Sequence, residues 1–411
     1  MNENRPSMLS VAEALARVTG GFSLIAAEQV ALPDALGRVL ADDVAARLTQ
    51  PPKAVSAMDG YAVRAADVAT VPATLTMIGE SQAGSGFDGA VGPGECSRIF
   101  TGAPLPEGAD AIVIQEDTDA DGTAITVKES VAVGADVRSA GLDFKLGDVL
   151  LKAGRVLTAR DIGLVAAMNV PWVRVRRKPR IAFVSTGDEV VMPGDPLGPD
   201  QIISSNSLLL EAYIKVLGGE PLNLGIAKDT DASLRATLAG AKGADALITI
   251  GGASVGDYDL VRKVMGEDGL ELDFYKVAMR PGKPLIFGSW NGIPVLGLPG
   301  NPVSAGVTSA LFLRAAMAVM LGIGDGSLVT ETVRLGRDLT ANGIRQDFMR
   351  ATLRTDADGQ LTATPFERQD SAMLARFAEA DCLVIRPVKA PPAKAGDLVL
   401  ILRLDVGIAG F

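Results

Sequence analysis

The stretch Ala246-Leu-Ile-Thr-Ile-Gly-Gly-Ala-Ser-Val-Gly-Asp-Tyr-Asp259 decides the fold that we expect for this chain. Its first five residues form an apolar run, which is typical of a strand buried on both faces of a sheet. Glycines follow at once, and a helical pattern runs from Tyr258 to Met265. A strand, a glycine-rich turn and a helix in this order indicate a βαβ unit whose turn amides can approach a ligand closely.

Strand and helix patterns alternate on both sides of this stretch, from residue 178 to residue 326. The expected strands are residues 181–185, 222–226, 246–250, 273–277, 285–287 and 295–298, and the expected helices are 206–218, 233–241, 258–265 and 302–321. This alternation predicts a central three-layer α/β domain with a mostly parallel sheet covered on both faces.

Different patterns flank this α/β segment and predict a multidomain chain. Residues 1–44 and 141–177 are expected to form one discontinuous helical/mixed N-terminal domain, in which a helix near 158–169 packs against a first helix at 8–18 capped by Ser7. Residues 45–140 read as a β-rich insert domain, and residues 327–411 as a C-terminal β-barrel-like domain. The basic segment 174–180 is interpreted as a solvated linker rather than a binding patch.

Composition excludes several classes of function. The net charge of −10 argues against a nucleic-acid partner. Cys96 and Cys382 form no CxxC pair, and no export signal precedes the first helix, so we expect a cytoplasmic protein. The longest apolar stretch is interrupted by Arg314, which argues against a membrane span.

The sequence contains no histidine. Serine-histidine or cysteine-histidine catalysis and histidine-bound zinc are therefore excluded. The remaining chemistry uses carboxylates, cations, hydroxyls and backbone amides, which favours hard cations and anionic substrates.

Ligands bind beyond the carboxyl ends of the strands in an open parallel sheet, so the loops there are candidate sites. Ser185-Thr186-Gly187-Asp188-Glu189 ends the first strand with two hydroxyls and two carboxylates. The glycine-rich loop 251–259 could hold phosphate, although half of such turns are only structural, and it lacks the Lys-Ser/Thr of a P-loop.

Two more loops belong to the same expected crevice. In Pro299-Gly300-Asn301-Pro302-Val303-Ser304, Asn301 is a natural N-cap and Pro302 a natural first helical residue. The turn Arg280-Pro281-Gly282-Lys283-Pro284 carries two cations, with Lys276 one strand length upstream. Solvated surface cations are the alternative interpretation of this turn.

Taken together, these loops resemble one family, the molybdopterin molybdenumtransferases of the MoeA type, which includes the E domain of gephyrin. Ser-Ala-Met-Asp-Gly-Tyr-Ala at 56–62 and Ile-Phe-Thr-Gly-Ala-Pro-Leu-Pro-Glu-Gly-Ala-Asp-Ala-Ile-Val at 99–113 look like its N-terminal motifs. Arg138, Gly141-Leu142-Asp143 and the loops above follow in the family's order. The resemblance implies insertion of molybdate into adenylylated molybdopterin, with release of AMP and formation of molybdenum cofactor.

The resemblance also implies roles for individual residues. The catalytic set is Asp59, Thr101, Asp143, Glu189 and Asp229. The substrate-binding set is Arg138, Asp188, Gly251, Gly252, Ser254, Gly256, Asp257, Lys276, Arg280, Lys283, Pro299, Gly300, Asn301, Pro302 and Ser304. Asp259 is the expected ligand of a Mg²⁺ cofactor, and Arg280 stands where some members have lysine, a change from a point charge to a planar fork.

The resemblance further implies an elongated homodimer, in which Asp59 and Thr101 of one subunit face the 251–259 loop of the other. Other molybdenum-cofactor biosynthesis proteins are possible partners. Two other functions stay open, a molybdopterin adenylyltransferase and a scaffold protein of the gephyrin E type. The segments outside residues 178–326 favour the insertase, because an isolated adenylyltransferase would not need them.

Overall fold

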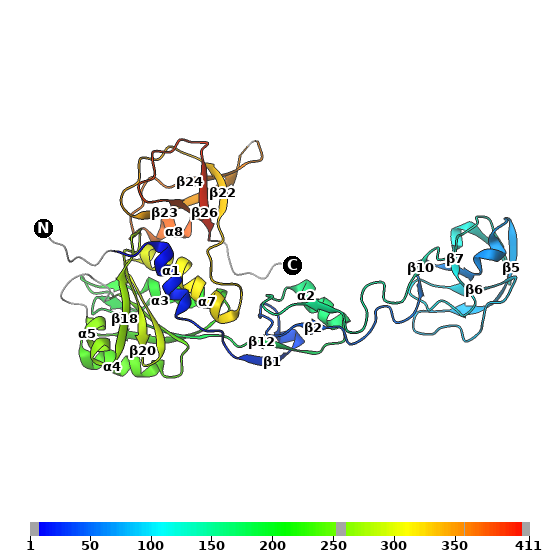
Figure 1. Ribbon diagram of the computed structural model, residues 1–411, viewed down its shortest axis with the longest axis horizontal. Helices are drawn as coiled ribbons and strands as arrows, with labels where there is room; N and C mark the ends of the chain where they lie inside the picture. The colour runs from blue at the N-terminus through cyan, green and yellow to red at the C-terminus, as the bar shows by residue number, and fades with distance from the viewer. Residues whose placement is uncertain (1–7, 252–259, 357, 405–411) are drawn as a thin grey trace.

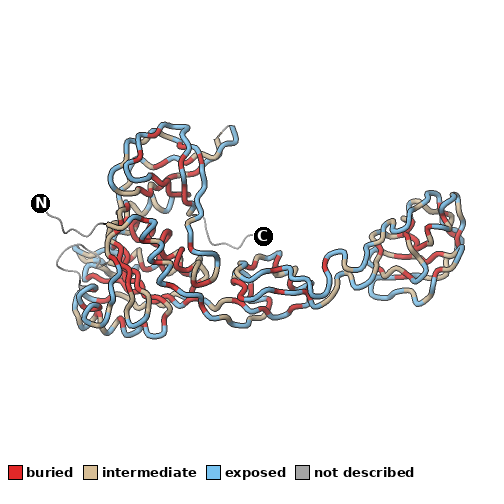
Figure 2. Tube along the Cα trace, in the orientation of Figure 1, coloured by how far each residue is buried: buried red, intermediate tan, exposed pale blue. Residues whose placement is uncertain are grey.

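The computed structural model describes residues 8–251, 260–356 and 358–404 as four packed domains along an elongated molecule (Figure 1). An α/β domain and a C-terminal β domain are stacked at one end, a small middle domain follows, and a distal β domain lies at the other end. Each domain has its own buried core (Figure 2). The multidomain α/β class expected from the sequence is confirmed.

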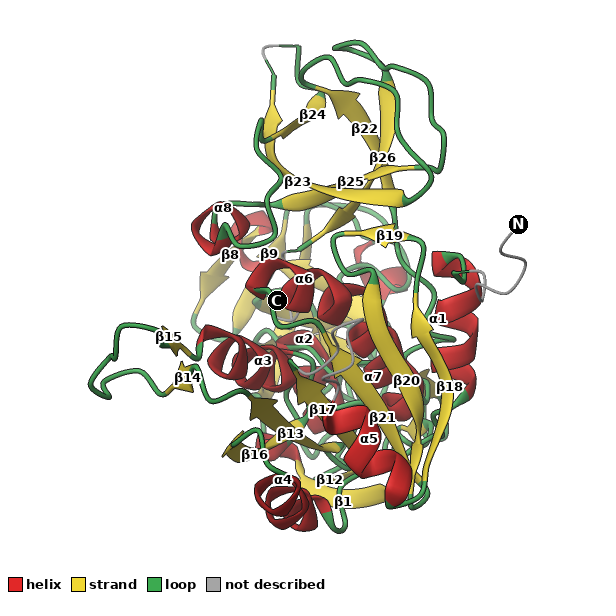
Figure 3. Cartoon of the chain, turned by 90° about the vertical axis from the view of Figure 1, so that its left-hand side faces the viewer, coloured by secondary structure: helices red, strands yellow, loops and turns green. Residues whose placement is uncertain are grey.

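A six-stranded sheet in the order β16-β13-β17-β21-β20-β18 forms the centre of the α/β domain (Figure 3). Its strands are β13 (Arg180–Thr186), β16 (Glu220–Ala227), β17 (Ala246–Ile250), β18 (Leu270–Lys276), β20 (Pro284–Trp290) and β21 (Ile293–Leu298). Strands β16, β13, β17 and β21 are parallel, whereas β20 is antiparallel to both β21 and β18. The predicted mostly parallel sheet is therefore confirmed.

Helices cover both faces of this sheet. They are α3 (Ser205–Val216), α4 (Asp231–Leu238) with η4 (Ala239–Ala241), α5 (Leu260–Glu267), and a continuous helix built from α6 (Pro302–Thr308), η5 (Ser309–Leu313) and α7 (Arg314–Leu321). Because side chains alternate along a strand, Phe183 of β13 enters the core with α3 and the long helix, and Val184 enters the core with α4 and α5.

The long helix 302–321 is the one helix among the described residues that could cross a membrane by length and composition alone. In the structure, 83% of its apolar window is buried inside the protein. Its side chains Leu311, Phe312 and Met317 belong to the core of the α/β domain. Burial against the sheet therefore accounts for its apolar character.

The first helix belongs to the α/β domain, contrary to our expectation. Helix α1 (Val11–Gly20) begins with a capping box between Ser10 and Glu13, and its apolar stripe joins the core around α7. Arg17 of α1 pairs with Asp273 of β18 at 2.7 Å. Helix α2 (Ala159–Ala167) contacts η1 (Leu32–Asp34) instead, because its apolar face is buried in the separate core of the middle domain.

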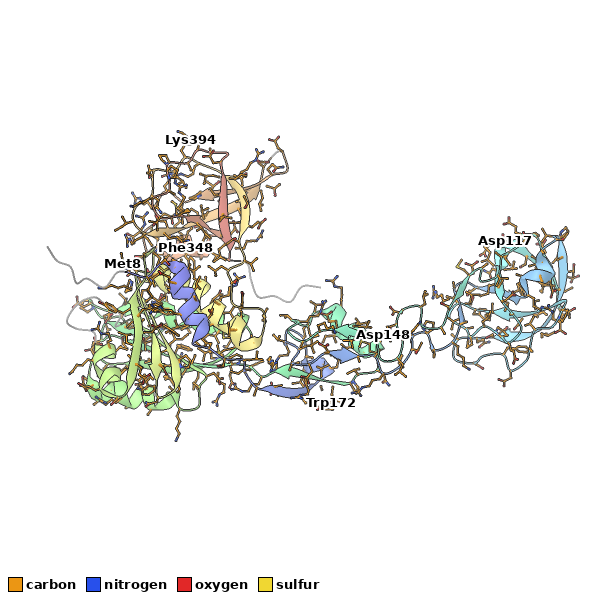
Figure 4. All side chains as sticks on the ribbon, viewed as in Figure 1. Met8, Asp117, Asp148, Trp172, Phe348 and Lys394 are labelled. Carbon is orange, nitrogen blue, oxygen red and sulfur yellow. The ribbon has the colours of Figure 1, made fainter. Side chains whose placement is uncertain are left out.

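The middle domain contains α2, η1 and two small antiparallel strand pairs. These strands are β1 (Ala27–Ala31), β2 (Val44–Ala45), β11 (Val149–Leu151) and β12 (Trp172–Arg176). Trp172 marks this domain in Figure 4, which also labels Asp117 in the distal domain and Phe348 between the α/β and C-terminal domains.

The expectation of a solvated linker at 174–180 was wrong. Most of the segment lies in strands β12 and β13, and Arg174 pairs with Asp42. Arg177 donates two hydrogen bonds to Asp245, at 2.7 and 2.5 Å, and the Arg180 N–H donates a third to the same carboxylate. Asp42 and Asp245 lie far from this segment in the sequence. The local sequence pattern therefore does not show that its arginines are paired.

The distal domain holds a six-stranded sheet in the order β7-β4-β6-β5-β9-β8. Its elements are β3 (Val55–Ser56), β4 (Gly60–Val63), η2 (Ala65–Val68), β5 (Ala73–Ser81), β6 (Glu95–Ile99), β7 (Ala111–Ile114), η3 (Gln115–Asp117), β8 (Thr118–Asp121), β9 (Ala124–Val127) and β10 (Val137–Arg138). This domain lies far from the α/β domain of the same chain (Figure 1).

The C-terminal domain is a closed five-stranded barrel (Figure 3). Its elements are β22 (Glu331–Leu335), β23 (Gln346–Thr355), β24 (Leu361–Pro365), α8 (Leu374–Ala378), β25 (Cys382–Arg386) and β26 (Leu398–Arg403). Strand β19 (Met279–Arg280) of the α/β domain pairs in parallel with β23, so the two domains share backbone hydrogen bonds. Phe348 of β23 is also part of the α/β core.

The Arg177–Asp245 contact predicts a pH-dependent contribution to stability. Burial opposes ionisation of Asp245, but the hydrogen bonds from Arg177 and the Arg180 N–H outweigh it and lower the pKa. A lowered folded-state pKa gives stability that is present above the unfolded pKa and lost as the pH falls through the folded pKa. We expect Asp245→Asn to cost about 2 kcal/mol at neutral pH, and less in acid.

Urea unfolding followed by tryptophan fluorescence at several pH values measures this effect. Glu211→Gln is the matched control, because Glu211 forms an exposed helical pair with Lys215 and should contribute no more than about 0.5 kcal/mol. Equal losses in both variants, or a loss for Asp245→Asn that does not change with pH, would contradict the prediction.

Candidate functional site

Several predicted site loops meet at one edge of the sheet, which we name the carboxyl edge. The parallel strands β13, β16, β17 and β21 end there. Strand β18 also runs toward this edge, because it is antiparallel to β20 and β20 is antiparallel to β21. The pairing of Lys276 with Pro284 places Lys276 and the neighbouring Lys283 there too.

A cavity of ≈ 360 Å³ opens at the carboxyl edge. Its walls come from the ends of β13 and β17, the starts of α3 and α6, and the short parallel pair β14 (Val190–Val191) and β15 (Ile202–Ile203). Glu189, Gly251, Gly300, Asn301 and Pro302 from the predicted set all line it. Ala372 of the C-terminal domain completes the wall, so two domains form the cavity.

The backbone at positions 251 and 187 of this edge has a geometry that favours glycine. Gly251 has φ +86°, and a side chain there would approach the Thr186 carbonyl oxygen to 3.1 Å. Gly300 lies opposite, where an added Cβ would be 3.7 Å from the Cα of Gly251. Gly187 has φ +134°, and a Cβ there would collide with the Glu189 carboxylate. Backbone from two strands can thus approach a bound group, and Glu189 folds over the end of β13.

The start of α6 differs from expectation in how Asn301 is used. Asn301 occupies the N-cap position and Pro302 the first helical position, as predicted, but the Asn301 side chain does not cap the helix. Its Nδ2 instead donates to Ser371 Oγ at 2.9 Å, in the C-terminal domain. The Val303 N–H donates to the Ser371 carbonyl at 3.1 Å, which satisfies an amide that a helix start leaves open.

Two buried polar atoms of the cavity residues have no hydrogen-bond partner among the described residues. They are Ser185 Oγ and Asn206 Oδ1. Ser185 is 3% exposed, and Asn206 uses its Nδ2 to donate to the Gly300 carbonyl at 2.6 Å. An unpaired buried polar atom is costly, so both are suited to bind polar groups of a substrate.

Sequence reasoning missed Asn206, Ser371 and Ala372 as site residues. Ser185 was noted only as a hydroxyl at a strand end. The strand-end position was a usable signal for Ser185, because ligands gather at such ends. Nothing in the local pattern around the other three indicates contact with the start of α6, because Asn206 and Ser371 lie 94 and 70 residues from their partners there.

The basic turn lies against α6, but Arg280 has an unexpected partner. An added Cβ on Gly282 would lie 2.5 Å from Thr308 Cγ2, one helical turn after Ser304. Arg280 forms an ion pair with Asp347 of β23. Burial raises the pKa of Asp347, while the Arg280 guanidinium acts in the opposite direction. Lys276 Nζ lies 4.6 Å from the ring centroid of Tyr275.

The carboxylates expected at this edge come from neighbouring loops. Asp188 Oδ1 accepts the Asp229 N–H at 3.2 Å, and Glu189 lines the cavity. Within residues 8–251, 260–356 and 358–404, no group of three Cys, Asp or Glu residues is placed to hold a metal ion. The predicted residues Gly252, Ser254, Gly256, Asp257 and Asp259 lie outside the described residues.

The remaining predicted residues belong to a different part of the molecule. Asp59 and Thr101 lie together in the distal domain, where Asp59 Oδ1 accepts the N–H and the hydroxyl of Thr101, each at 2.7 Å. These two bonds lower the pKa of Asp59, the backbone bond contributing most. Arg138 lies in β10 of the same domain, and Asp143 lies in the connection to the middle domain, where its N–H donates to the Gln50 carbonyl. Within one chain these residues do not meet the carboxyl edge (Figure 1).

Three family descriptions match successive segments of the chain. Residues 9–169 match the family description "MoeA N-terminal region (domain I and II)", residues 182–318 match "Probable molybdopterin binding domain", and residues 332–404 match "MoeA C-terminal region (domain IV)". The three matched segments cover the distal and middle domains, the α/β domain and the barrel.

Individual relatives align over most of the chain. The molybdopterin molybdenumtransferase of Nostoc sp. is 36% identical over 392 residues, which are 92% of this chain and 89% of that protein. The Bacillus subtilis protein of the same name is 34% identical, over 96% of this chain and 94% of its own length. The crystal structure of a molybdopterin biosynthesis MoeA protein from Pyrococcus horikoshii has a TM-score of 0.84 at 32% identity, covering 97% of this chain and 99% of that one. The chain belongs to the molybdopterin molybdenumtransferase family of the MoeA type.

Proposed function

We propose that this protein is a molybdenum insertase, which takes molybdate and adenylylated molybdopterin, releases AMP and forms molybdenum cofactor. The observation that carries the proposal is the cavity at the carboxyl edge. Unpaired buried polar atoms, closely approaching glycine backbone, and Lys276 and Lys283 at the same edge of the sheet suit a charged substrate there. The curated relatives bear the name of this activity.

Soft metal ligands on the protein are unnecessary for this reaction, because the dithiolene sulfurs of the pterin bind the molybdenum. The chain has no histidine, and Cys96 and Cys382 are both buried. Burial raises the pKa of the Cys96 thiol to about 12, so this cysteine supplies no thiolate. The protein therefore contributes anion binding, orientation and carboxylates.

Each group at the carboxyl edge has a role in this proposal. The backbone at Gly251 and Gly300 holds the phosphate of the adenylyl group. Arg280, Lys283 and Ser304 hold molybdate, which as a tetrahedral oxyanion accepts charge-assisted hydrogen bonds. Glu189 is the cavity carboxylate that holds or releases a proton as AMP leaves.

We propose Mg²⁺ as the cation that the reaction needs. The anionic side chains at the carboxyl edge are carboxylates, whose oxygens are the ligands that hard divalent cations prefer. Asp188 and Asp229 lie in adjacent loops, where the Asp229 N–H donates to Asp188 Oδ1, and their carboxylates would supply such oxygens. Asp259 is the further ligand that the family resemblance implies. When bound, Mg²⁺ would neutralise charge on the phosphate.

We also propose that two subunits share each site as a homodimer. Asp59 and Thr101 carry an ionised carboxylate and a hydroxyl on the exposed surface of the distal domain. This domain is too far from the carboxyl edge of its own chain to act there (Figure 1). A two-fold axis would bring each distal domain to the partner's cavity and form two equal sites.

An adenylyltransferase and a scaffold protein are weaker alternatives. A molybdopterin adenylyltransferase would need only the α/β domain, whereas this chain matches its relatives through the flanking domains as well. A scaffold would need no cavity with unpaired polar atoms. We place the enzyme in the cytoplasm, with other molybdenum-cofactor biosynthesis proteins as its partners and without nucleic-acid or membrane partners.

The activity and its cation are tested together. Purified protein treated with EDTA should release AMP from adenylylated molybdopterin only when both molybdate and Mg²⁺ are added. A reaction without molybdate is the control. Full turnover without any divalent cation would overturn the role of Mg²⁺, and a failure of every cation to support AMP release would overturn the proposed function.

The molybdate site predicts where a heavy oxyanion binds. Lys283→Ala and Ser304→Ala should each weaken tungstate binding about tenfold, because each removes one hydrogen bond to a charged group. Calorimetry measures the affinity, and anomalous diffraction locates the tungsten. Lys215→Ala is the matched control, since Lys215 pairs with Glu211 on α3. Anomalous density confined to another surface would refute the assignment.

The shared site predicts complementation between two inactive variants. Asp59→Ala removes the carboxylate of the distal domain, and Lys283→Glu replaces a positive charge at the carboxyl edge by a negative one. Each homodimer should be inactive, but a mixed dimer isolated with two different tags should recover about half of wild-type turnover, because one of its two sites is intact. No recovery in a verified mixed dimer would mean that each site lies within one chain.

A further inference from the structure

We infer that the loop Phe366–Met373 of the C-terminal domain is a substrate-binding wall of the cavity, and that Arg350 is the residue that positions it. The expected effect on substrate binding rests on the proposed function. The expected effect on the position of the loop rests on the contacts of the loop alone.

The loop reaches the cavity through Ser371 and Ala372. The Ser371 carbonyl accepts the Val303 N–H at 3.1 Å, and its Oγ accepts Asn301 Nδ2 at 2.9 Å. Ala372 follows directly and lines the cavity opposite Gly251 and Gly300. A displacement of this loop would thus free an amide at the start of α6 and change the shape of the cavity.

Arg350 holds both ends of this loop. Its Nε donates to Gln369 Oε1 at 3.2 Å, and its Nη1 donates to the Met373 carbonyl at 3.3 Å. The Arg350 N–H also donates to Gln369 Oε1, and the Arg350 carbonyl accepts the Phe366 N–H and Gln369 Nε2, all at 3.0 Å. Five hydrogen bonds therefore join one residue of β23 to Phe366, Gln369 and Met373.

The burial of Arg350 argues for a positioning role rather than for stability. The residue is 1% exposed and is the largest fully buried side chain of the described residues. Its Nη2 has no hydrogen-bond partner among those residues, and burial lowers its pKa. A buried charge costs free energy unless it is paired, so burial of a guanidinium does not by itself stabilise the fold. What it offers here is two fixed donors, Nε and Nη1, directed at Gln369 and Met373.

The test compares Arg350→Met with Arg354→Met on the same strand. Arg354 is a suitable control because its side chain is 76% exposed. In Arg350→Met we expect hydrogen exchange of the Val303 amide to accelerate about tenfold, since its acceptor is released. We also expect KM for adenylylated molybdopterin to rise about tenfold with little change in kcat, because the loop shapes binding. Arg354→Met should change neither quantity.

Arg350→Lys should give intermediate values of both quantities. Its ammonium group keeps cationic donors but lacks the planar guanidinium, which directs separate N–H groups at Gln369 and Met373. Gln369→Ala removes the hydrogen bonds between Gln369 and Arg350 but keeps the buried charge and the bond to Met373. It replaces Arg350→Met if that variant does not fold. Unchanged Val303 exchange together with unchanged KM in a folded variant would overturn the inference. Wild-type protein that does not turn over would overturn the proposed function instead, while the exchange measurement would still decide the role of Arg350.

Discussion

The parallel alignment of β13, β17 and β21 is the constraint on which the rest of the structure depends. It brings chain segments near residues 187, 251 and 300 to one edge, although they are far apart in sequence. The register of strand pairing matters as much as the strand direction. If one strand shifted by one residue, its side chains would exchange between the two faces of the sheet. Phe183 and Val184 would then change cores, and the glycines would no longer face one another.

The sequence predicted the sheet and its edge because both depend on local patterns. The expected strand at 246–250 coincides with β17, since five consecutive apolar or β-branched residues between turn signals leave little choice. The cavity wall was only half predictable. Asn206, Ser371 and Arg350 act through partners 94, 70 and 19 residues away, and no periodicity encodes such pairs. The same holds for Arg177, whose partner Asp245 is 68 residues away.

Two residues on a single strand of the barrel hold segments at the carboxyl edge. Asp347 and Arg350 of β23 are both buried, and each contacts a different segment near the carboxyl edge. Asp347 holds Arg280 of the basic turn, and Arg350 holds the loop beside α6. Because β23 also pairs with β19 of the α/β domain, movement of the barrel would shift the basic turn and the loop beside α6 together. The barrel is thus mechanically part of the site, although the α/β domain supplies most of the cavity.

Arginine at position 280 follows from this arrangement. Burial raises the pKa of Asp347, and the Arg280 guanidinium acts in the opposite direction. Arginine spreads its charge over a planar fork of donors, whereas lysine offers a single point charge. The guanidinium also carries five N–H donors, and its side chain is still 56% exposed after pairing with Asp347. One part of the fork can therefore fix the turn while another part remains available to a tetrahedral anion.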